Sequence, residues 1–286
     1  MGHILVNNKL AKGICACLLA LGVAACQSNS SGLVYQNVPI DKAVGSSSNI
    51  DSLSAVVDAN PTDADAYNKR GIAYAKAGRL DQAIEDFNKS LQLRPNSYQA
   101  YANRALVERR KGNTSQAVQD YSSALSIKPD YVKALNGRGN TYRSIGQNTA
   151  ALRDYNEVIR LNSGDAQAYH NRGLIYQAQG LQEAALNDFS SAVGLNSRAY
   201  SPLIARGVTY LSLSDPKSAL KDFNAAIALN GKSASAWANR GRAEEALGQV
   251  TEARQSYSRA LQISSTNQIA KEGSQRLSTS SGVPQA

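Results

Sequence analysis

The chain has 286 residues, of which 31 are basic and 22 acidic, so its formal net charge is +9. Apolar residues make up 42%, as in globular proteins, but charged residues reach only 19%, below the usual share of about 25%. The three cysteines are Cys15, Cys17 and Cys26. The rest of the chain therefore cannot contain a disulfide framework or a cysteine metal site.

Residues 1–25 are predicted to be a lipoprotein signal peptide. Lys9 and Lys12 give a basic start, and the apolar run 13–23 that follows is shorter than the roughly 20 residues of a membrane span. A Val-Ala-Ala-Cys sequence ending at Cys26 resembles the bacterial lipobox, whose cysteine is acylated when the signal is cleaved. We therefore expect Cys26 to be the lipid attachment site. The alternative is an ordinary secretory signal followed by a chance cysteine.

The residue after Cys26 bears on the membrane that would hold the protein. In bacterial lipoproteins an aspartate there often causes retention in the inner membrane, but this chain has Gln27. We therefore expect an outer-membrane protein that faces the periplasm. Without residues 1–25 the chain keeps 29 basic and 22 acidic residues, a net charge of +7. In an exported protein this charge favours acidic proteins, cell-wall polymers or anionic lipids as partners, and not nucleic acid.

Two segments precede the main body of the chain. Residues 26–46 are rich in serine, asparagine and glycine, a composition typical of a flexible tether. In the next segment Ile50, Leu53 and Val57 keep helical spacing until Pro61. We predict an N-terminal capping helix at 47–61.

An arginine followed by a small residue then recurs six times, always 34 residues apart and without an insertion or deletion. A strict period of this length predicts a solenoid, in which one supersecondary unit is copied and stacked. Apolar residues in each unit follow two helical stretches separated by a turn. The predicted units are 64–97, 98–131, 132–165, 166–199, 200–233 and 234–267.

Small and aromatic residues recur at fixed positions of the unit. Position 20 is alanine in all six units, and position 24 is aromatic, as in Phe87 and Tyr121. With a large residue at position 4 and a small one at position 8, this pattern resembles the tetratricopeptide repeat (TPR) family. The resemblance implies an all-α, right-handed α-solenoid of six tandem TPR helix-turn-helix units with short capping helices at both ends. The second cap is predicted at 268–277, followed by a disordered tail at 278–286.

Arginine at position 7 is constant in this chain, whereas the family usually has leucine there. An aspartate follows 16 residues later in five units, but the sixth unit has Ser256 after Arg240. We predict an Arg–Asp bridge between the two helices of each unit, with Arg240 more exposed or paired elsewhere. The alternative is a row of arginines that binds an acidic ligand. Position 11 also departs from the family, because Glu108 and Glu244 replace its aromatic residue.

In the resembling family the first helices form a concave wall that binds an extended peptide or a helix. In this chain the wall would be basic and rich in amides in the second to fourth units, which suits carboxylates and peptide backbone. The alternative is a solvated face without a ligand. The candidate partner-binding residues are Arg109, Arg110, Lys133, Asn136, Asn140, Arg143, His170 and Gln177.

Two narrower functions find little support in the sequence. One TPR subgroup clamps a terminal carboxylate, but only Asn140 and Asn171 match its pattern, and the positions of its cations do not. Catalysis is not expected either, because the histidines are His3 and His170, and no metal-binding pair, nucleophile elbow or phosphate loop occurs. We therefore expect no catalytic residues, no metal and no cofactor.

The sequence thus predicts a non-enzymatic, lipid-anchored scaffold or adaptor of the bacterial envelope. Its concave groove would bind a protein or peptide partner during envelope assembly, secretion or pilus biogenesis. The alternative is a cell-wall adaptor that binds peptidoglycan peptides or positions a wall enzyme. The identity of the partner and the oligomeric state are left open.

Overall fold

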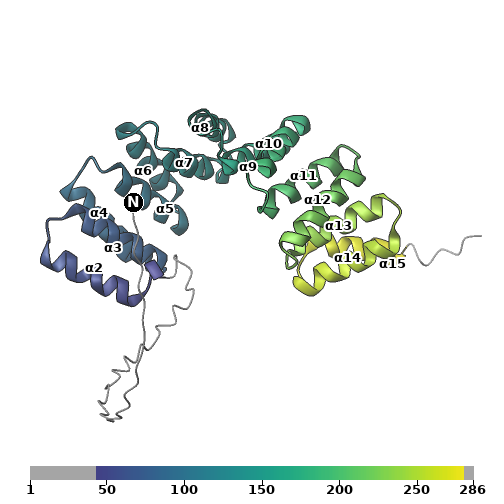
Figure 1. Ribbon diagram of the computed structural model, residues 1–286, viewed down its shortest axis with the longest axis horizontal. Coiled ribbons are helices and arrows are strands. Elements are labelled where there is room, and N and C mark those ends of the chain that lie inside the picture. The colour runs from purple at the N-terminus through teal and green to yellow at the C-terminus, as the bar shows by residue number, and fades with distance from the viewer. Residues whose placement is uncertain (1–42, 280–286) are drawn as a thin grey trace, which may run out of the picture. The chain divides into compact units, whose positions relative to one another are not determined.

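The computed structural model describes residues 43–279, which all belong to the compact unit Pro39–Ala286. The predicted signal peptide, Cys26, most of the tether and the last seven residues lie outside this range. Within it, fourteen helices follow one another and no strand occurs (Figure 1). None of these helices has the length and apolar content that crossing a bilayer requires.

Each of the six repeats contains two helices joined by a tight turn. The first helices are α3 (Ala64–Lys76), α5 (Tyr98–Lys111), α7 (Val132–Ser144), α9 (Ala166–Ala178), α11 (Tyr200–Ser212) and α13 (Ala234–Ala246). The second helices are α4 (Leu80–Leu93), α6 (Thr114–Ile127), α8 (Asn148–Leu161), α10 (Gln182–Leu195), α12 (Pro216–Leu229) and α14 (Val250–Ile263).

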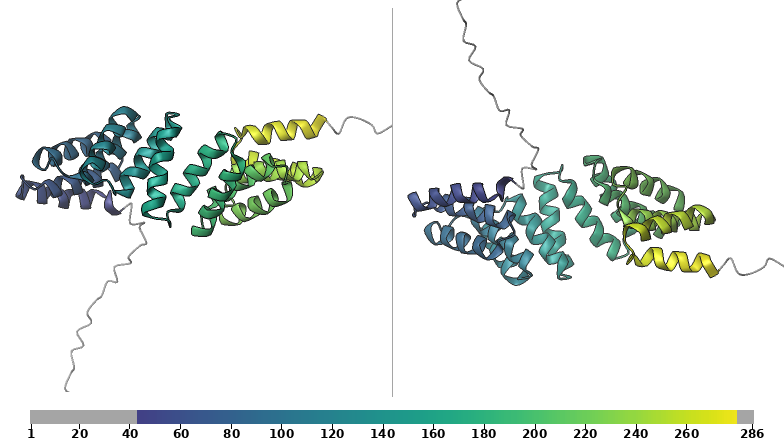
Figure 2. Two further views of the ribbon diagram at one scale, coloured as in Figure 1. Left: turned by 90° about the horizontal axis from the view of Figure 1, so that it is seen from above. Right: turned by 90° about the horizontal axis from the view of Figure 1, so that it is seen from below.

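The repeats stack in chain order, as the views in Figure 2 show. Each second helix packs between its own first helix and the first helix of the next repeat. First helices also contact each other from one repeat to the next, whereas second helices within 43–279 do not. The first helices therefore lie closer together and form the inner, concave wall of the stack.

The turns inside the repeats need a left-handed residue. Gly78 has a φ of +79° and ends α3, and glycines occupy the same place in four other repeats. Glycine reaches this region without the steric cost that a Cβ brings. In the fifth repeat Ser214 takes the position with a φ of 59°. Asp215 and Pro216 then begin α12, and the Asp215 side chain accepts a hydrogen bond from the Ser218 amide.

A partial repeat covers each end of the stack. Helix α2 (Ser47–Ala59) packs on α3 as a second helix would, and it ends two residues before the predicted boundary at 61. Helix α15 (Gln268–Thr279) packs on α13 and α14 in the place of a first helix. Gly273 of α15 lies against the Tyr257 ring, which fixes this last helix closely.

The predicted end of the last helix and start of a disordered tail are wrong by two residues. We predicted a helix at 268–277 and disorder from 278, but α15 continues through Thr279. Leu277 is buried against the preceding repeat and holds the last turn in place. The hydroxyls of Ser278 and Thr279 also donate to carbonyls one turn earlier. The remaining residues of the predicted tail, 280–286, lie outside the described range.

Close packing inside a repeat depends on the small residue at position 8. A Cβ added at Gly71 would lie 2.8 Å from the ring of Phe87, and one at Gly207 would lie 2.6 Å from the ring of Phe223. Both rings are fully buried. The glycine thus lets the first helix approach the aromatic residue at position 24 of the second helix, and the two residues recur together for this reason.

The position 7 arginines form the bridges that the sequence predicts in the first five repeats. In the third repeat Arg138 donates from Nε and Nη2 to the two carboxylate oxygens of Asp154, at 2.9 and 2.8 Å. Asp154 is only 5% exposed. Two parallel charge-assisted hydrogen bonds make this pair both strong and directional. The corresponding pairs are Arg70–Asp86, Arg104–Asp120, Arg172–Asp188 and Arg206–Asp222.

The same arginines also reach back to the preceding repeat. Nη1 of Arg138 donates to the Ser122 hydroxyl at 3.1 Å, and Nη1 of Arg104 donates to the Asn88 amide oxygen at 2.7 Å. Each acceptor lies 16 residues before its arginine, as far as the aspartate lies after it. Arg70 makes this contact with Ser54 of α2, so the capping helix uses the same bond. One guanidinium therefore connects three helices.

In the sixth repeat the arginine is paired elsewhere, as predicted. Arg240 donates from Nε to Glu244 Oε1 at 2.7 Å within the same helix, and Ser256 donates to the other oxygen of Glu244 at 2.6 Å. The Arg240 side chain is 29% exposed, against 16–22% for the other five. Glu244, whose position is aromatic in most repeats, thus supplies the carboxylate that Ser256 lacks.

We predict that Asp154→Ala lowers the free energy of unfolding by roughly 3–5 kcal/mol, because it leaves the Arg138 guanidinium largely buried without its counter-ion. Chemical denaturation of the purified variant measures this change.

Asp81→Ala is the matched control. Asp81 pairs with Lys111 but is 83% exposed, so its loss should cost no more than about 1 kcal/mol. Equal effects of the two substitutions would contradict a structural role for the bridge.

Candidate functional site

The eight predicted partner-binding residues lie on three successive first helices of the inner wall. Arg109 and Arg110 lie in the last turn of α5, and His170 and Gln177 belong to α9. The other four are on α7, namely Lys133, Asn136, Asn140 and Arg143. The structure thus places the predicted set on one wall, but only part of it surrounds a single hollow.

Four of the eight line a cleft of about 290 Å³ between α5 and α7. We call this the basic cleft. Arg109 lies on its α5 side, and Lys133, Asn136 and Asn140 lie on its α7 side. Other lining residues are Tyr121, Tyr131 and Gln167. Two cations and several amides therefore face one hollow, with two phenol rings beside them.

Two buried polar atoms in the basic cleft have no hydrogen-bond partner. These are Nε of Arg109, a donor, and Oδ1 of Asn136, an acceptor. The other end of the Asn136 side chain is fixed, because its Nδ2 donates to Asp165 Oδ2 at 2.8 Å. A buried polar atom left without a partner costs about 1–3 kcal/mol. Both atoms are closed off from the surface of the basic cleft, so they show loose local pairing behind its lining.

Asn140 connects the basic cleft to the fourth repeat. Its Oδ1 accepts hydrogen bonds from the Tyr155 hydroxyl at 2.7 Å and from Asn171 Nδ2 at 2.9 Å. Burial raises the pKa of Tyr155 to about 12, so its hydroxyl stays protonated and remains a donor. Both bonds use the oxygen of Asn140, so the side chain that lines the basic cleft is held in place from the fourth repeat.

The remaining predicted residues lie outside the basic cleft. Arg110 donates to the Ala75 carbonyl at 3.0 Å and lines a separate apolar hollow of about 120 Å³. Gln177 donates to Thr209 at 2.8 Å and so joins α9 to α11. Arg143 is exposed, and its charge acts on both Tyr155 and His170.

His170 lines a wider and more apolar hollow of about 480 Å³ in the fourth to sixth repeats. Leu174, Ile204 and Val208 share this lining. The imidazole stacks at a tilt on Phe189, with ring centres 5.7 Å apart, and its buried Nδ1 has no partner. Burial, and then the nearby Arg143 charge, lower the pKa of His170 to about 4, so the ring is neutral near pH 7.

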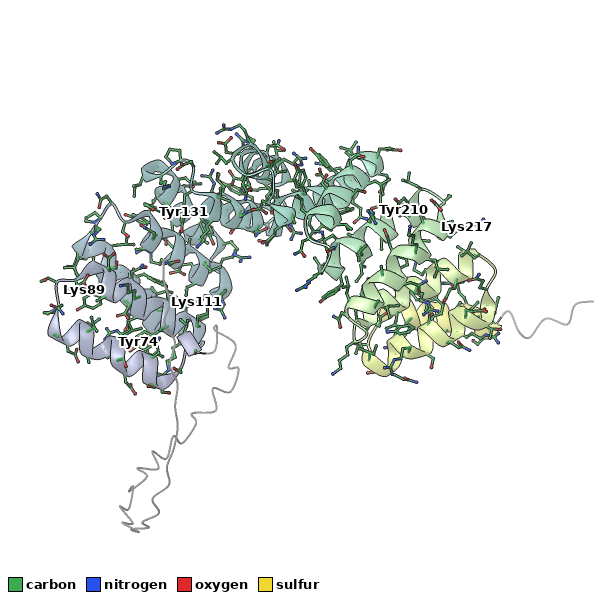
Figure 3. The ribbon with its side chains drawn as sticks, in the orientation of Figure 1. Tyr74, Lys89, Lys111, Tyr131, Tyr210 and Lys217 are labelled. Atoms are coloured by element: carbon green, nitrogen blue, oxygen red, sulfur yellow. The ribbon has the colours of Figure 1, made fainter. Side chains whose placement is uncertain are left out.

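Sequence reasoning missed the aromatic lining of the basic cleft. Tyr131 begins α7 at its N-cap (Figure 3) and packs edge-on against Tyr98, with ring centres 4.8 Å apart. Tyr121 occupies position 24, which usually serves the core. Its ring lies so close to Gly137 of the next repeat that a Cβ there would approach Cζ to 2.3 Å. The glycine at position 6, where other repeats carry asparagine, lysine or alanine, was the available signal.

The described residues contain no group of three or more histidine, cysteine, aspartate or glutamate side chains that could hold a metal ion. What this wall offers is hydrogen bonding, positive charge and hollows of different polarity. It is suited to binding a partner.

We predict that Gly137→Ala destabilises the protein by about 1–3 kcal/mol, because the added methyl group overlaps the Tyr121 ring. Thermal or chemical unfolding measures the change. The control is Gly194→Ala on α10, where a Cβ meets nothing within 4 Å. Alanine there should match or stabilise the parent by up to about 1 kcal/mol. Destabilisation of equal size at both sites would show that the Tyr121 contact is not the cause.

We also predict that His170 makes the protein less stable in acid. The unfolded chain takes up a proton at this residue near pH 6.5, whereas the folded protein does so only near pH 4. The free energy of unfolding should therefore fall between these values as the pH falls. Unfolding curves of the parent and of His170→Gln across this range isolate the contribution. Parallel pH dependences of the two proteins would contradict it.

Family models match most of the repeats. Models described as tetratricopeptide repeat match residues 64–97, 166–198 and 204–267. A model described as TPR repeat matches residues 105–143 and 139–180. Together these matches cover well over half of the chain. Among curated proteins no match is found.

Several solved structures share the fold at low identity. A chain of the APC/C Cut9–Hcn1 hetero-tetramer is 18% identical with a TM-score of 0.69, over 83% of this chain and 48% of that one. This chain therefore spans about half the length of that protein. PilW, a type IV pilus biogenesis factor, is 15% identical with a TM-score of 0.66, over 73% and 97% of the two chains. YrrB, described as having an unusual peptide-binding site, is 20% identical with a TM-score of 0.54, over 65% and 96%.

These structures share the stacked helix pairs described above, and the family models match the repeats that carry the Arg–Asp bridges. The chain belongs to the tetratricopeptide repeat family and folds as a right-handed α-solenoid of tandem repeats.

Proposed function

We propose that the protein is a lipid-anchored scaffold of the bacterial envelope that holds a protein partner on its inner wall. TPR proteins mediate protein–protein interactions and typically act as non-enzymatic adaptors. The observation that carries the proposal is the basic cleft, where charged and amide side chains surround a hollow. Such a lining suits the carboxylates and peptide groups of a protein partner.

Charge supports the same kind of partner. The chain downstream of the predicted signal peptide has 29 basic and 22 acidic residues. On the inner wall, Arg109 and Lys133 meet at the basic cleft and Arg143 lies exposed on the same helix as Lys133. A positive wall accelerates the approach of an acidic partner and disfavours basic ones.

Solved structures with a similar fold offer an analogy for the cellular setting. PilW is a pilus biogenesis factor, and YrrB has a peptide-binding site, by their own descriptions. At these identities the likeness shows the fold alone. The envelope setting of this protein rests on the predicted signal and on Cys26, which lie outside the described residues.

The anchor has a direct test in cells. Metabolic labelling with an alkyne fatty acid should modify the parent protein and not Cys26→Ala, and the variant should leave the membrane fraction. Several buried acyl chains hold a protein firmly because each methylene contributes about 0.8 kcal/mol. Equal labelling and equal sedimentation of the two proteins would contradict a lipid anchor at Cys26.

We predict that reversing the charge of the wall abolishes partner capture. Arg109→Glu, Lys133→Glu and Arg143→Glu together should remove the proteins recovered by crosslinked pull-down from native membranes. If the same proteins are still recovered after this change, the partner does not bind at the inner wall.

The control carries the same change of charge on the second helices. Lys89 and Lys217 lie on α4 and α12 (Figure 3), and Lys221 lies one turn further along α12. Reversing these three should leave capture unchanged. Salt-sensitive pelleting with purified peptidoglycan is the second arm. If the parent protein pellets with peptidoglycan and captures no protein, it is a cell-wall adaptor and not a scaffold.

A further inference from the structure

A second, apolar hollow lies between the first helices of repeats one and two, beside the basic cleft. Its volume is about 120 Å³, well below the roughly 300–1,000 Å³ of small-molecule sites, so it suits one or two side chains. Its lining includes the buried residues Phe87 and Val107. Ile72 and Leu106 also line it, and Leu106 is 43% exposed. We call this the small hollow.

The lining changes at the next step of the stack. Ile72 and Leu106 occupy position 9 of their repeats, where the third repeat has Asn140. Leu106 and Asn103 line both the small hollow and the basic cleft. The inner wall therefore passes from apolar to basic and polar within one repeat.

The chain enters the stack next to the small hollow. The residues before α2 form a tight turn, in which the Ser46 amide donates to the Ala43 carbonyl at 3.2 Å. Gly45 of this turn lies so close to the end of α3 that a Cβ there would approach the Ala77 nitrogen to 2.7 Å. Lys76, one residue earlier in α3, lines the small hollow. The segment upstream of residue 43 therefore starts beside this hollow.

We propose that the small hollow is occupied by Ile40 of the same chain. The contact covers the exposed side of Leu106 and the part of the inner wall next to the basic cleft. A partner then has to displace this segment before it can use that part of the wall. This self-blocking contact is independent of the proposed function.

Ile40 is close enough in the chain to reach the small hollow. It lies five residues before Gly45, and an extended chain spans about 3.3–3.6 Å per residue, so it can lie up to about 16–18 Å away. Gly45 and the small hollow both adjoin Lys76, so the chain has to cross only the end of one helix, which is about 10–12 Å wide. A segment attached at such short range has a high effective concentration, so a modest gain from burial is enough to dock it.

The residue that follows Ile40 matches the charge at the rim of the small hollow. Lys76 and Arg110 both line the hollow and are exposed. Arg110 is held there because it donates to the Ala75 carbonyl at 3.0 Å. When Ile40 is buried, its neighbour Asp41 brings a carboxylate to these two cations. An aliphatic side chain next to an acid thus fits an apolar hollow with a basic rim.

Thiol labelling of the full chain, purified in detergent, tests the contact. Leu106→Cys places a thiol in the lining, and mass spectrometry of the peptide that carries it gives its rate of reaction with N-ethylmaleimide. Ile40→Ser should raise this rate by about tenfold, because burial of an isoleucine favours the docked form by at least about that factor. Ile40→Val keeps most of the side chain and should change the rate little. An unchanged rate in Ile40→Ser would overturn the proposal.

A second thiol separates this contact from general effects. Leu195→Cys on α10 replaces another exposed leucine, 47% accessible, far along the chain from the small hollow. Its labelling rate should not respond to Ile40→Ser. If both thiols respond alike, the change is not local and the proposal fails.

Charge reversal tests the rim. Asp41→Arg should raise the labelling rate of Leu106→Cys, because it places a third cation beside Lys76 and Arg110. The matched control is Asp51→Arg, which reverses an exposed acid on α2 and should leave the rate unchanged. Equal effects of the two reversals would refute the pairing of Asp41 with the rim.

Other occupants of the small hollow give different results. A second copy of the chain would make the labelling rate fall as the protein concentration rises, whereas a contact within one chain makes the rate independent of concentration. A partner's side chain would leave the thiol reactive in the pure protein and protect it only after membrane extract is added. Either result would overturn the proposal.

Discussion

The guanidinium at position 7 is the constraint on which the rest of the stack depends. Arg138 bonds to Asp154 of its own repeat and to Ser122 of the repeat before it, so it fixes both the pairing of two helices and the step between repeats. In a solenoid each repeat touches only its neighbours, so stability is shared through such interfaces. An apolar residue fills space, but it does not set the register as a bidentate ion pair does. The bridge therefore costs desolvation and gives a defined geometry in return.

This arrangement separates structure from recognition on the same helices. The arginines of the bridges are mostly buried, and all three nitrogens of Arg138 already donate to side chains of the protein, so they have little left to offer a ligand. The arginines at position 12 are the opposite case: Arg109 lines the basic cleft, and Arg143 is exposed. Residues that are the same in every repeat stabilise the solenoid. Residues that differ between repeats determine the charge and polarity of the inner wall.

Much of the fold could be predicted from the sequence because each pattern recurs in several units and can be compared between them. The same spacing of arginine and aspartate in five repeats indicated a contact between the helices, and the loss of the aspartate at Ser256 indicated an exception. The carboxylate that replaces it was not predicted, since Glu244 was noted only as a departure from an aromatic position. The end of α15 was misjudged because burial of Leu277 extends the helix into the serine and threonine residues that follow it.

The site was only partly predictable. The position of a residue in its repeat predicts that it lies on the inner wall, but not whether it lines a cleft there. Arg109, Lys133, Asn136 and Asn140 come together, while Arg110 and Gln177 turn to bonds inside the protein. Tyr121 entered the lining because Gly137 leaves room for its ring, a contact between repeats that no motif position describes.

The most direct test of this account is a double-mutant cycle between Arg138 and Ser122, measured by chemical unfolding of Arg138→Met, Ser122→Ala and the double variant. If the arginine connects the repeats as well as the two helices of its own, the effects should be non-additive, with a coupling energy above about 0.5 kcal/mol. Additive effects would contradict the central claim and reduce the bridge to a contact within one repeat.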